Sequence, residues 1–117
     1  MPERHGTCIL VRHAHGVVSI IAPWNYPIEE VLNLALPALI AGNAAIIKPS
    51  EVTPLSSGAT VECLTRGLEL HAPGLLHLVQ GDGALGAYLV SHPGVDMCAF
   101  TGSSACLLYT SPSPRDS

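Results

Sequence analysis

The sequence predicts an α/β fold, a Rossmann-like parallel sheet with flanking helices. Four short apolar runs of strand length alternate with three segments whose apolar residues recur every three or four positions. Proline or glycine residues separate these segments. The repeated strand–helix order is the pattern of right-handed βαβ units, which place successive strands parallel in one sheet.

The first strand is expected over residues 17–22, a β-branched run that ends at Pro23. The apolar period then changes, and residues 27–41 are predicted to form a helix. Gly42 suits a helix stop in the left-handed conformation. The inner face of this helix is expected to consist of Ile28, Val31, Leu32, Ala35, Leu36, Leu39 and Ile40.

The start of this helix carries two further signals. Pro27 suits the first helical position. Glu29 and Glu30 suit the first turn because the helix dipole favours acidic side chains there.

A second buried strand is expected over residues 44–47, and Lys48-Pro49 ends it. Thr53 is interpreted as the cap of a second helix and Pro54 as its first residue. The inner face of that helix is expected to carry Val61, Leu64 and Leu68.

The last elements are shorter. A third strand is expected over residues 75–79 and a fourth over residues 95–100. The short helix between them is expected to turn Leu85, Tyr88 and Leu89 inward. Before the first strand, residues 7–12 are compatible with a strand that pairs elsewhere.

Composition excludes several classes of protein. The chain has 117 residues, 48% of them hydrophobic, and a net charge of −4. Without a basic patch, nucleic acid is a poor partner. No apolar run reaches the ~18 residues of a membrane span, so a soluble, cytoplasmic protein is expected. Four scattered cysteines predict neither a disulfide framework nor a zinc site, and no metal is expected.

Four segments follow the predicted strands and precede helices: 23–27, 48–51, 81–86 and 100–103. Ligands of open parallel sheets bind beyond the carboxyl ends of the strands. We therefore expect all four segments to face one crevice.

The third segment matches the dinucleotide fingerprint in its three glycines, Gly81, Gly83 and Gly86. The fingerprint also requires an acid about 20 residues later, at the end of the next strand. Asp96 comes too soon, and Glu51 comes before the glycines. The local pattern therefore fits either an unusual dinucleotide-binding order or a plain turn.

Polar residues of the other segments each allow two interpretations. Lys48 and Glu51 suit the hydroxyls of a ribose, or an exposed ion pair. The Ser103 hydroxyl and its neighbouring N–H groups suit a pyrophosphate, or a helix cap. Asn25 suits a developing oxyanion, or again a helix cap.

Three short sequence motifs, in this order and at this spacing, resemble motifs of the aldehyde dehydrogenase superfamily, and the resemblance covers residues 16–104. They are Pro-Trp-Asn-Tyr-Pro at 23–27, Ala-Gly-Asn followed by Lys-Pro-Ser-Glu at 41–51, and Phe-Thr-Gly-Ser at 100–103. The resemblance implies the unusual dinucleotide fold of that family, in which the acid precedes the glycines.

The resemblance also implies roles for individual residues. Asn25 resembles the asparagine that stabilises the oxyanion formed when a cysteine attacks the aldehyde. Lys48 and Glu51 resemble the pair that holds the adenosine ribose, and Ser103 the serine at the pyrophosphate. The implied cofactor-binding positions are Ile21, Ala22, Pro23, Trp24, Lys48, Ser50, Glu51, Gly83, Gly86, Phe100, Thr101, Gly102 and Ser103.

The implied cofactor is NAD, because a carboxylate at Glu51 binds ribose hydroxyls and repels a 2′-phosphate. Lys48 offsets part of that repulsion, so NADP stays open as an alternative. The implied substrate is a small-molecule aldehyde, and the implied parent enzyme is a homo-oligomer.

The family's catalytic cysteine and water-activating glutamate normally lie beyond the Phe-Thr-Gly-Ser segment. We therefore expect a fragment that is inactive alone, with an N-terminal strand or linker (1–16), a partial NAD(P)-binding domain (17–104) and a disordered, non-native tail (105–117). Two alternatives are an acyl-phosphate or semialdehyde reductase of the same superfamily, and a non-catalytic nucleotide-binding fragment.

Overall fold

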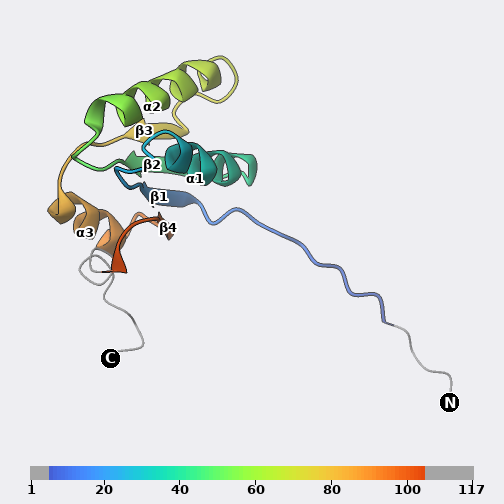
Figure 1. Ribbon diagram of the computed structural model, residues 1–117. Coiled ribbons are helices and arrows are strands. Elements are labelled where there is room, and N and C mark those ends of the chain that lie inside the picture. The colour runs from blue at the N-terminus through green and yellow to red at the C-terminus, as the bar shows by residue number, and fades with distance from the viewer. Residues whose placement is uncertain (1–5, 105–117) are drawn as a thin grey trace.

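The computed structural model describes residues 6–104, and within them strands and helices alternate as the sequence predicts (Figure 1). The elements in chain order are β1 (Val17–Ile21), α1 (Glu29–Ile40), β2 (Ala44–Lys48), α2 (Pro54–Leu68), β3 (Leu76–Leu78), α3 (Gly83–Ser91) and β4 (Met97–Phe100).

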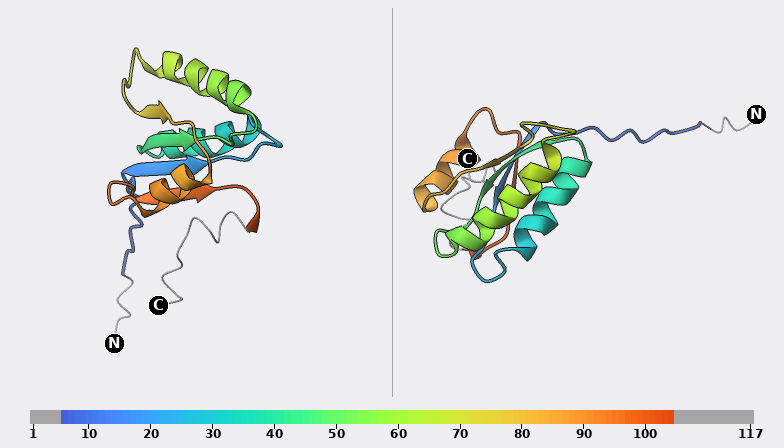
Figure 2. Two further views of the ribbon diagram at one scale, coloured as in Figure 1. Left: turned by 90° about the vertical axis from the view of Figure 1, so that its left-hand side faces the viewer. Right: turned by 90° about the horizontal axis from the view of Figure 1, so that it is seen from above.

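The four strands form one parallel sheet in the order β3-β2-β1-β4. Helices α1 and α2 cover one face of the sheet, and α3 lies on the other (Figure 2). The chain moves outward from β1 to β3 and then returns past β1 to place β4 on the opposite side. The strand order therefore reverses between β1 and β4, which is where open α/β sheets bind ligands. The predicted fold class is confirmed.

The core lies between the sheet and the α1–α2 layer. Its buried residues come from three strands, two helices and the residue that follows β1: Val18, Ile20, Ala22, Val31, Ala35, Ala45, Ile47, Val61 and Leu76. Strand β1 buries residues on both faces, as an inner strand of a parallel sheet does. Leu64 and Leu68 pack against this core, so the predicted inner face of α2 is confirmed.

The predicted inner face of α1 is partly wrong. Ile28, Leu36 and Ile40 are 50%, 42% and 85% exposed. The predicted Val31, Ala35 and Leu39 do face the core, and Leu34 and Ala38, which were not predicted, pack beside them. The helix is apolar on more than one side, so its periodicity alone could not select the stripe that meets the sheet. It also begins at Glu29, two residues after Pro27.

The predicted start of α2 is confirmed in position, with Thr53 at the cap and Pro54 as the first residue, but the buried Thr53 hydroxyl makes no capping hydrogen bond. The predicted inner face of α3 is partly wrong. Tyr88 of α3 is 59% exposed, whereas Leu89 and Gly86 are buried. The cap that does form is at α3, where the Asp82 carboxylate accepts from the Ala84 N–H at 3.0 Å.

Two side chains secure the start of β1. The buried Asn43 accepts hydrogen bonds from the N–H groups of His15 (2.7 Å) and Gly16 (3.1 Å), and its amide donates to the Ala38 carbonyl (2.9 Å). Asp96 accepts from the Val17 N–H at 2.8 Å. Gly16 has a φ of 123°, and a Cβ there would collide with the Asp96 carboxylate. This edge of the sheet is therefore closed by the chain's own polar groups.

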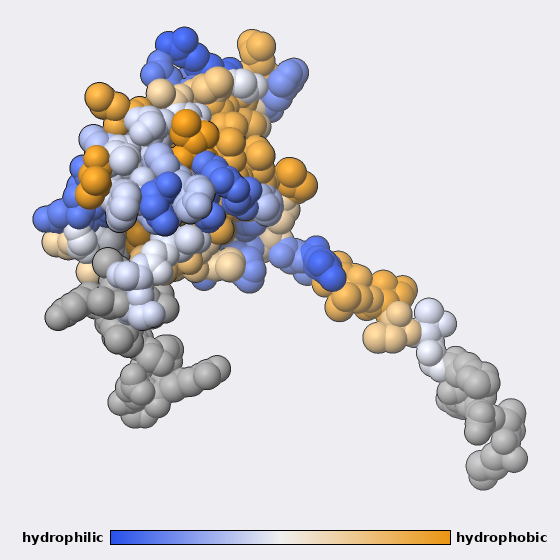
Figure 3. All heavy atoms as spheres, viewed as in Figure 1, coloured by the Kyte–Doolittle hydropathy of each residue, from blue (hydrophilic) through white to orange (hydrophobic). Residues whose placement is uncertain are grey.

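Residues 6–15 have no regular secondary structure and extend away from the sheet, with the apolar stretch 9–11 exposed (Figures 1 and 3). The strand considered for residues 7–12 is therefore not formed. The tail 105–117, and the helix expected after Ser103, lie outside the described residues. Within residues 6–104, no helix combines the length and apolar character needed to cross a membrane.

Candidate cofactor-binding site

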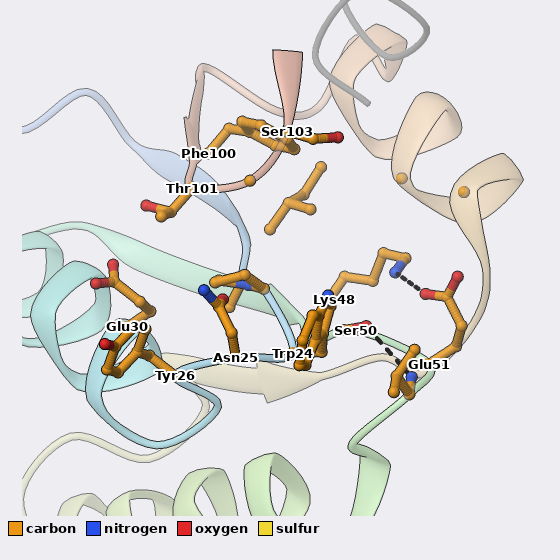
Figure 4. A pocket seen from close by; sticks show the side chains of 17 residues that line it. Trp24, Asn25, Tyr26, Glu30, Lys48, Ser50, Glu51, Phe100, Thr101 and Ser103 are labelled. Carbon is orange, nitrogen blue, oxygen red and sulfur yellow. Dashed lines mark hydrogen bonds and ion pairs between the residues drawn. The ribbon is translucent and has the colours of Figure 1, made fainter. Parts of the chain in front are cut away.

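A cavity of about 510 Å³ opens at the carboxyl edge of the sheet, beside the point where the strand order reverses (Figure 4). All four predicted segments contribute to it. Its lining comprises Ile21, Ala22, Pro23, Trp24, Asn25, Tyr26, Glu30, Lys48, Ser50, Glu51, Val52, Gly83, Gly86, Phe100, Thr101, Gly102 and Ser103. The structure thus brings together Asn25 and every residue that the sequence assigned to the cofactor.

Backbone hydrogen bonds hold the loops of three strands side by side at this edge. The Ala22 N–H donates to the Lys48 carbonyl at 3.2 Å, and the Thr101 N–H donates to the Ile21 carbonyl at 3.1 Å. Each bond continues a strand ladder by one residue beyond its last paired position. The loops therefore leave the sheet at the same level and face the same space.

Lys48 and Glu51 differ in burial, which bears on the two interpretations of this pair. The Lys48 side chain is 4% exposed, and its ammonium donates to the Pro49 carbonyl at 3.0 Å. The Glu51 carboxylate lies 3.7 Å from that ammonium and is 58% exposed. This is not a pair of solvated surface charges, because the cation is fixed inside the fold. The carboxylate has oxygen atoms free to accept hydroxyl donors from the cavity.

Ser50 shapes the loop between β2 and α2. Its hydroxyl accepts from the Val52 N–H at 3.2 Å, and its carbonyl accepts from the Thr53 N–H at 3.3 Å. These bonds form a tight turn that brings Glu51 and Val52 to the wall of the cavity.

Gly81 and Gly83, near the start of α3, are glycines for different structural reasons. A Cβ on Gly81 would lie 2.7 Å from the Leu85 side chain, so Gly81 is needed for packing, and it does not line the cavity. A Cβ on Gly83 would meet nothing within 4 Å. Gly83 is therefore not required by contacts of the fold, and it leaves the α3 side of the cavity open.

The loop after β1 carries three exposed residues, Trp24, Asn25 and Tyr26. Its far end is held by the buried Ser57 of α2, whose hydroxyl donates to the Pro27 carbonyl at 3.1 Å. Asn25 is not a helix cap, because the cap position of α1 is Ile28. The amide of Asn25 is therefore available at the cavity wall.

Comparison with known proteins decides the family. The sequence model of the aldehyde dehydrogenase family matches residues 1–108. The chain belongs to the aldehyde dehydrogenase family. It is 44% identical over 106 residues to a geranial dehydrogenase of Castellaniella defragrans, an alignment that covers 89% of this chain and 22% of that relative.

Solved structures of this family have the same fold. A putative aldehyde dehydrogenase from Burkholderia cenocepacia superposes with a TM-score of 0.77 at 41% identity, covering 86% of this chain and 21% of that one. The NAD-dependent aldehyde dehydrogenase of Sinorhizobium meliloti gives 0.75 at 34% identity, covering 86% and 20%. The chain thus spans about a fifth of the length of these family members.

Three lining residues were not predicted as part of this aldehyde dehydrogenase site: Tyr26, Glu30 and Val52. Tyr26 lies in the loop before α1 and Glu30 in its first turn, and this four-residue spacing places the two side chains on one face. That spacing was a usable signal, but the helix dipole already accounted for Glu30.

Among residues 6–104, no three His, Cys, Asp or Glu side chains cluster as a metal site.

Proposed function

We propose that this chain is the cofactor-binding part of an NAD(P)-dependent aldehyde dehydrogenase, an oxidoreductase that acts on the aldehyde group of its substrate. One observation carries the proposal. The segments 23–27, 48–51 and 100–103, which have the strings of that family, line a single cavity at the switch point of the sheet. Family membership and the NAD-dependent relatives support it.

The residues present fit a dinucleotide. Glu51 offers an exposed carboxylate for the two hydroxyls of a ribose, and the ammonium of Lys48 lies beside it. Gly83 leaves room on the α3 side. Ser103 and the N–H groups near it are assigned to the pyrophosphate. Bound NAD would accept the hydride that leaves the aldehyde carbon. We favour NAD over NADP because a 2′-phosphate would meet the Glu51 carboxylate.

Asn25 is assigned the catalytic role in this chain. Its amide faces the cavity from a loop held at both ends, by the Ala22–Lys48 ladder bond and by the Ser57–Pro27 bond. An amide donor kept in place before the reaction stabilises negative charge on the substrate oxygen without reorganising first. Asn25 would therefore donate to the oxyanion of the aldehyde.

The remaining features of the parent enzyme are also proposals. The family's nucleophilic cysteine and its water-activating glutamate are assigned to segments beyond this chain, so residues 1–117 alone should oxidise no aldehyde. We assign the parent to the cytoplasm as a homo-oligomer. A reductase of acyl phosphates or semialdehydes would share this cofactor site, and the products formed by the complete enzyme distinguish the two reactions.

The proposal can be tested through Trp24, the single tryptophan of the chain, which lines the cavity. NADH absorbs where tryptophan emits, so bound NADH should quench Trp24 emission and itself fluoresce by energy transfer. Glu51→Ala should weaken this titration about tenfold or more. Glu69→Ala serves as the control, because Glu69 follows the carboxyl end of α2 and does not line this cavity. Absence of saturable quenching in the wild-type chain would reject the proposal.

A further inference from the structure

One end of the cavity is formed by Tyr26 and Glu30, neither of which has a role in the proposed cofactor site. The Glu30 N–H donates to the Tyr26 carbonyl at 3.0 Å, so the two residues are one helical turn apart. Their side chains consequently share a face. Figure 4 shows them together at one end of the cavity, with Lys48 and Glu51 at the other end and Asn25 between. We refer to Tyr26 and Glu30 as the acidic corner.

Of the two acidic side chains that line the cavity, one has a cation beside it and the other has none among the described residues. Glu30, Lys48 and Glu51 are its three charged residues, and Lys48 lies 3.7 Å from Glu51. Within residues 6–104 no Lys, Arg or His side chain lies within ion-pair distance of Glu30. Among the described residues, the acidic corner therefore presents a negative charge to the cavity with no cation beside it.

The helix dipole explains why an acid lies in the first turn of α1, but it does not explain why Glu30 lies in the wall of the cavity. Glu29 is in the same turn, is exposed, and does not line the cavity. The dipole interacts with both acids alike, because it acts along the helix axis. Of these two acids, only Glu30 lies both in the first turn of α1 and in the wall of the cavity. The neighbouring Glu29 is thus an internal control for any effect of charge at this helix end.

Tyr26 adds a second attraction for positive charge. Its side chain is 57% exposed and lines the same end of the cavity as Glu30. The face of an aromatic ring attracts a cation, including one that has no hydrogen to donate. A carboxylate and an aromatic ring together select an ammonium group over a neutral group of the same shape.

We propose that the aldehyde of the complete enzyme carries a cationic nitrogen, which the acidic corner holds while Asn25 meets the carbonyl oxygen. This inference rests on the proposed function and specifies its substrate class. A neutral aldehyde of the same shape lacks both attractions and should be a poorer substrate.

The test compares two aldehydes of nearly equal shape on the complete enzyme that contains this chain. Trimethylammonioacetaldehyde carries the charge, and tert-butylacetaldehyde replaces its nitrogen by carbon. The wild-type kcat/KM should favour the cation about tenfold or more. Glu30→Gln should remove most of that preference by lowering kcat/KM for the cation and leaving the neutral aldehyde nearly unchanged. Glu29→Gln should leave the ratio of the two aldehydes as it is.

Inhibition gives a second measure that requires no turnover of the cation. Tetramethylammonium ion should compete with tert-butylacetaldehyde, and Glu30→Gln should weaken that inhibition. Equal kcat/KM values for the two aldehydes in the wild type, or an unchanged ratio in Glu30→Gln, would overturn the inference and leave the dehydrogenase proposal intact. Failure to form NADH from any aldehyde would overturn both.

Discussion

The two edges of the sheet use polar residues in opposite ways. At the amino edge, Asn43 is 3% exposed and its side chain makes three hydrogen bonds to the chain's own backbone. At the carboxyl edge, Asn25 is exposed on a loop and lines a cavity. The same side-chain amide is committed to the fold at one edge and left available at the other. Satisfied polar groups stabilise structure, whereas polar groups that face a cavity are candidates to bind ligands.

The comparison is tested most strongly at Asn25 itself. In the complete enzyme, Asn25→Ala should lower kcat about 10²–10³-fold, because one preorganised donor to the oxyanion is lost. The melting temperature should change little, since the side chain is exposed. Steady-state kinetics and a thermal melt of the same preparation check both points. An unchanged kcat would reject the catalytic role.

Asn43→Ala should produce the opposite result. It removes the acceptor of two backbone N–H groups and the donor to Ala38, so we expect about 3 kcal/mol of destabilisation. Denaturant unfolding of the chain measures this loss, with Asn33→Ala as the control because Asn33 is exposed in α1. If Asn43→Ala and Asn33→Ala are equally stable, the amino edge is not secured as described.

Ser57→Ala probes the contact between the fold and the Asn25 loop. Losing the buried bond to the Pro27 carbonyl should cost about 1 kcal/mol. It should also lower the emission anisotropy of Trp24, which lies in the same loop. Thr60→Val is the matched control, because it removes a hydroxyl of the same helix that donates to the Ser56 carbonyl. An equal drop in anisotropy in both variants would exclude a specific role for Ser57.

Gly83→Ala should have the smallest effect on the fold. Nothing lies within 4 Å of the added Cβ, and alanine is favoured over glycine in a helix, so stability should rise by up to about 1 kcal/mol. NADH affinity should nevertheless fall, because the methyl group narrows the cavity. Calorimetry of NADH binding and a thermal melt separate the two effects. Unimpaired affinity would mean that the cofactor does not approach Gly83.

Much of the cavity could be predicted from the sequence, because ligands of open parallel sheets bind beyond the carboxyl ends of the strands. Apolar runs and turn residues locate the carboxyl ends of the strands, and parallel strands bring those ends to one edge. This rule brings the four segments to one cavity; the individual cofactor positions within them came from the resemblance to aldehyde dehydrogenases, and all of them, from Ile21 to Ser103, line the same cavity as Asn25. The acidic corner was missed because the helix dipole was a sufficient local reason for Glu30.

The sequence by itself determined the order of strands and helices, their parallel arrangement and the segments at the cavity, because these depend on local periodicity and turn chemistry. Only the tertiary structure decided which stripe of α1 meets the sheet and that Tyr88 faces outward. It also showed that Asn43 bonds to residues 27 and 28 positions away and that Glu30 faces the cavity. These features depend on contacts between distant segments, which no local pattern encodes.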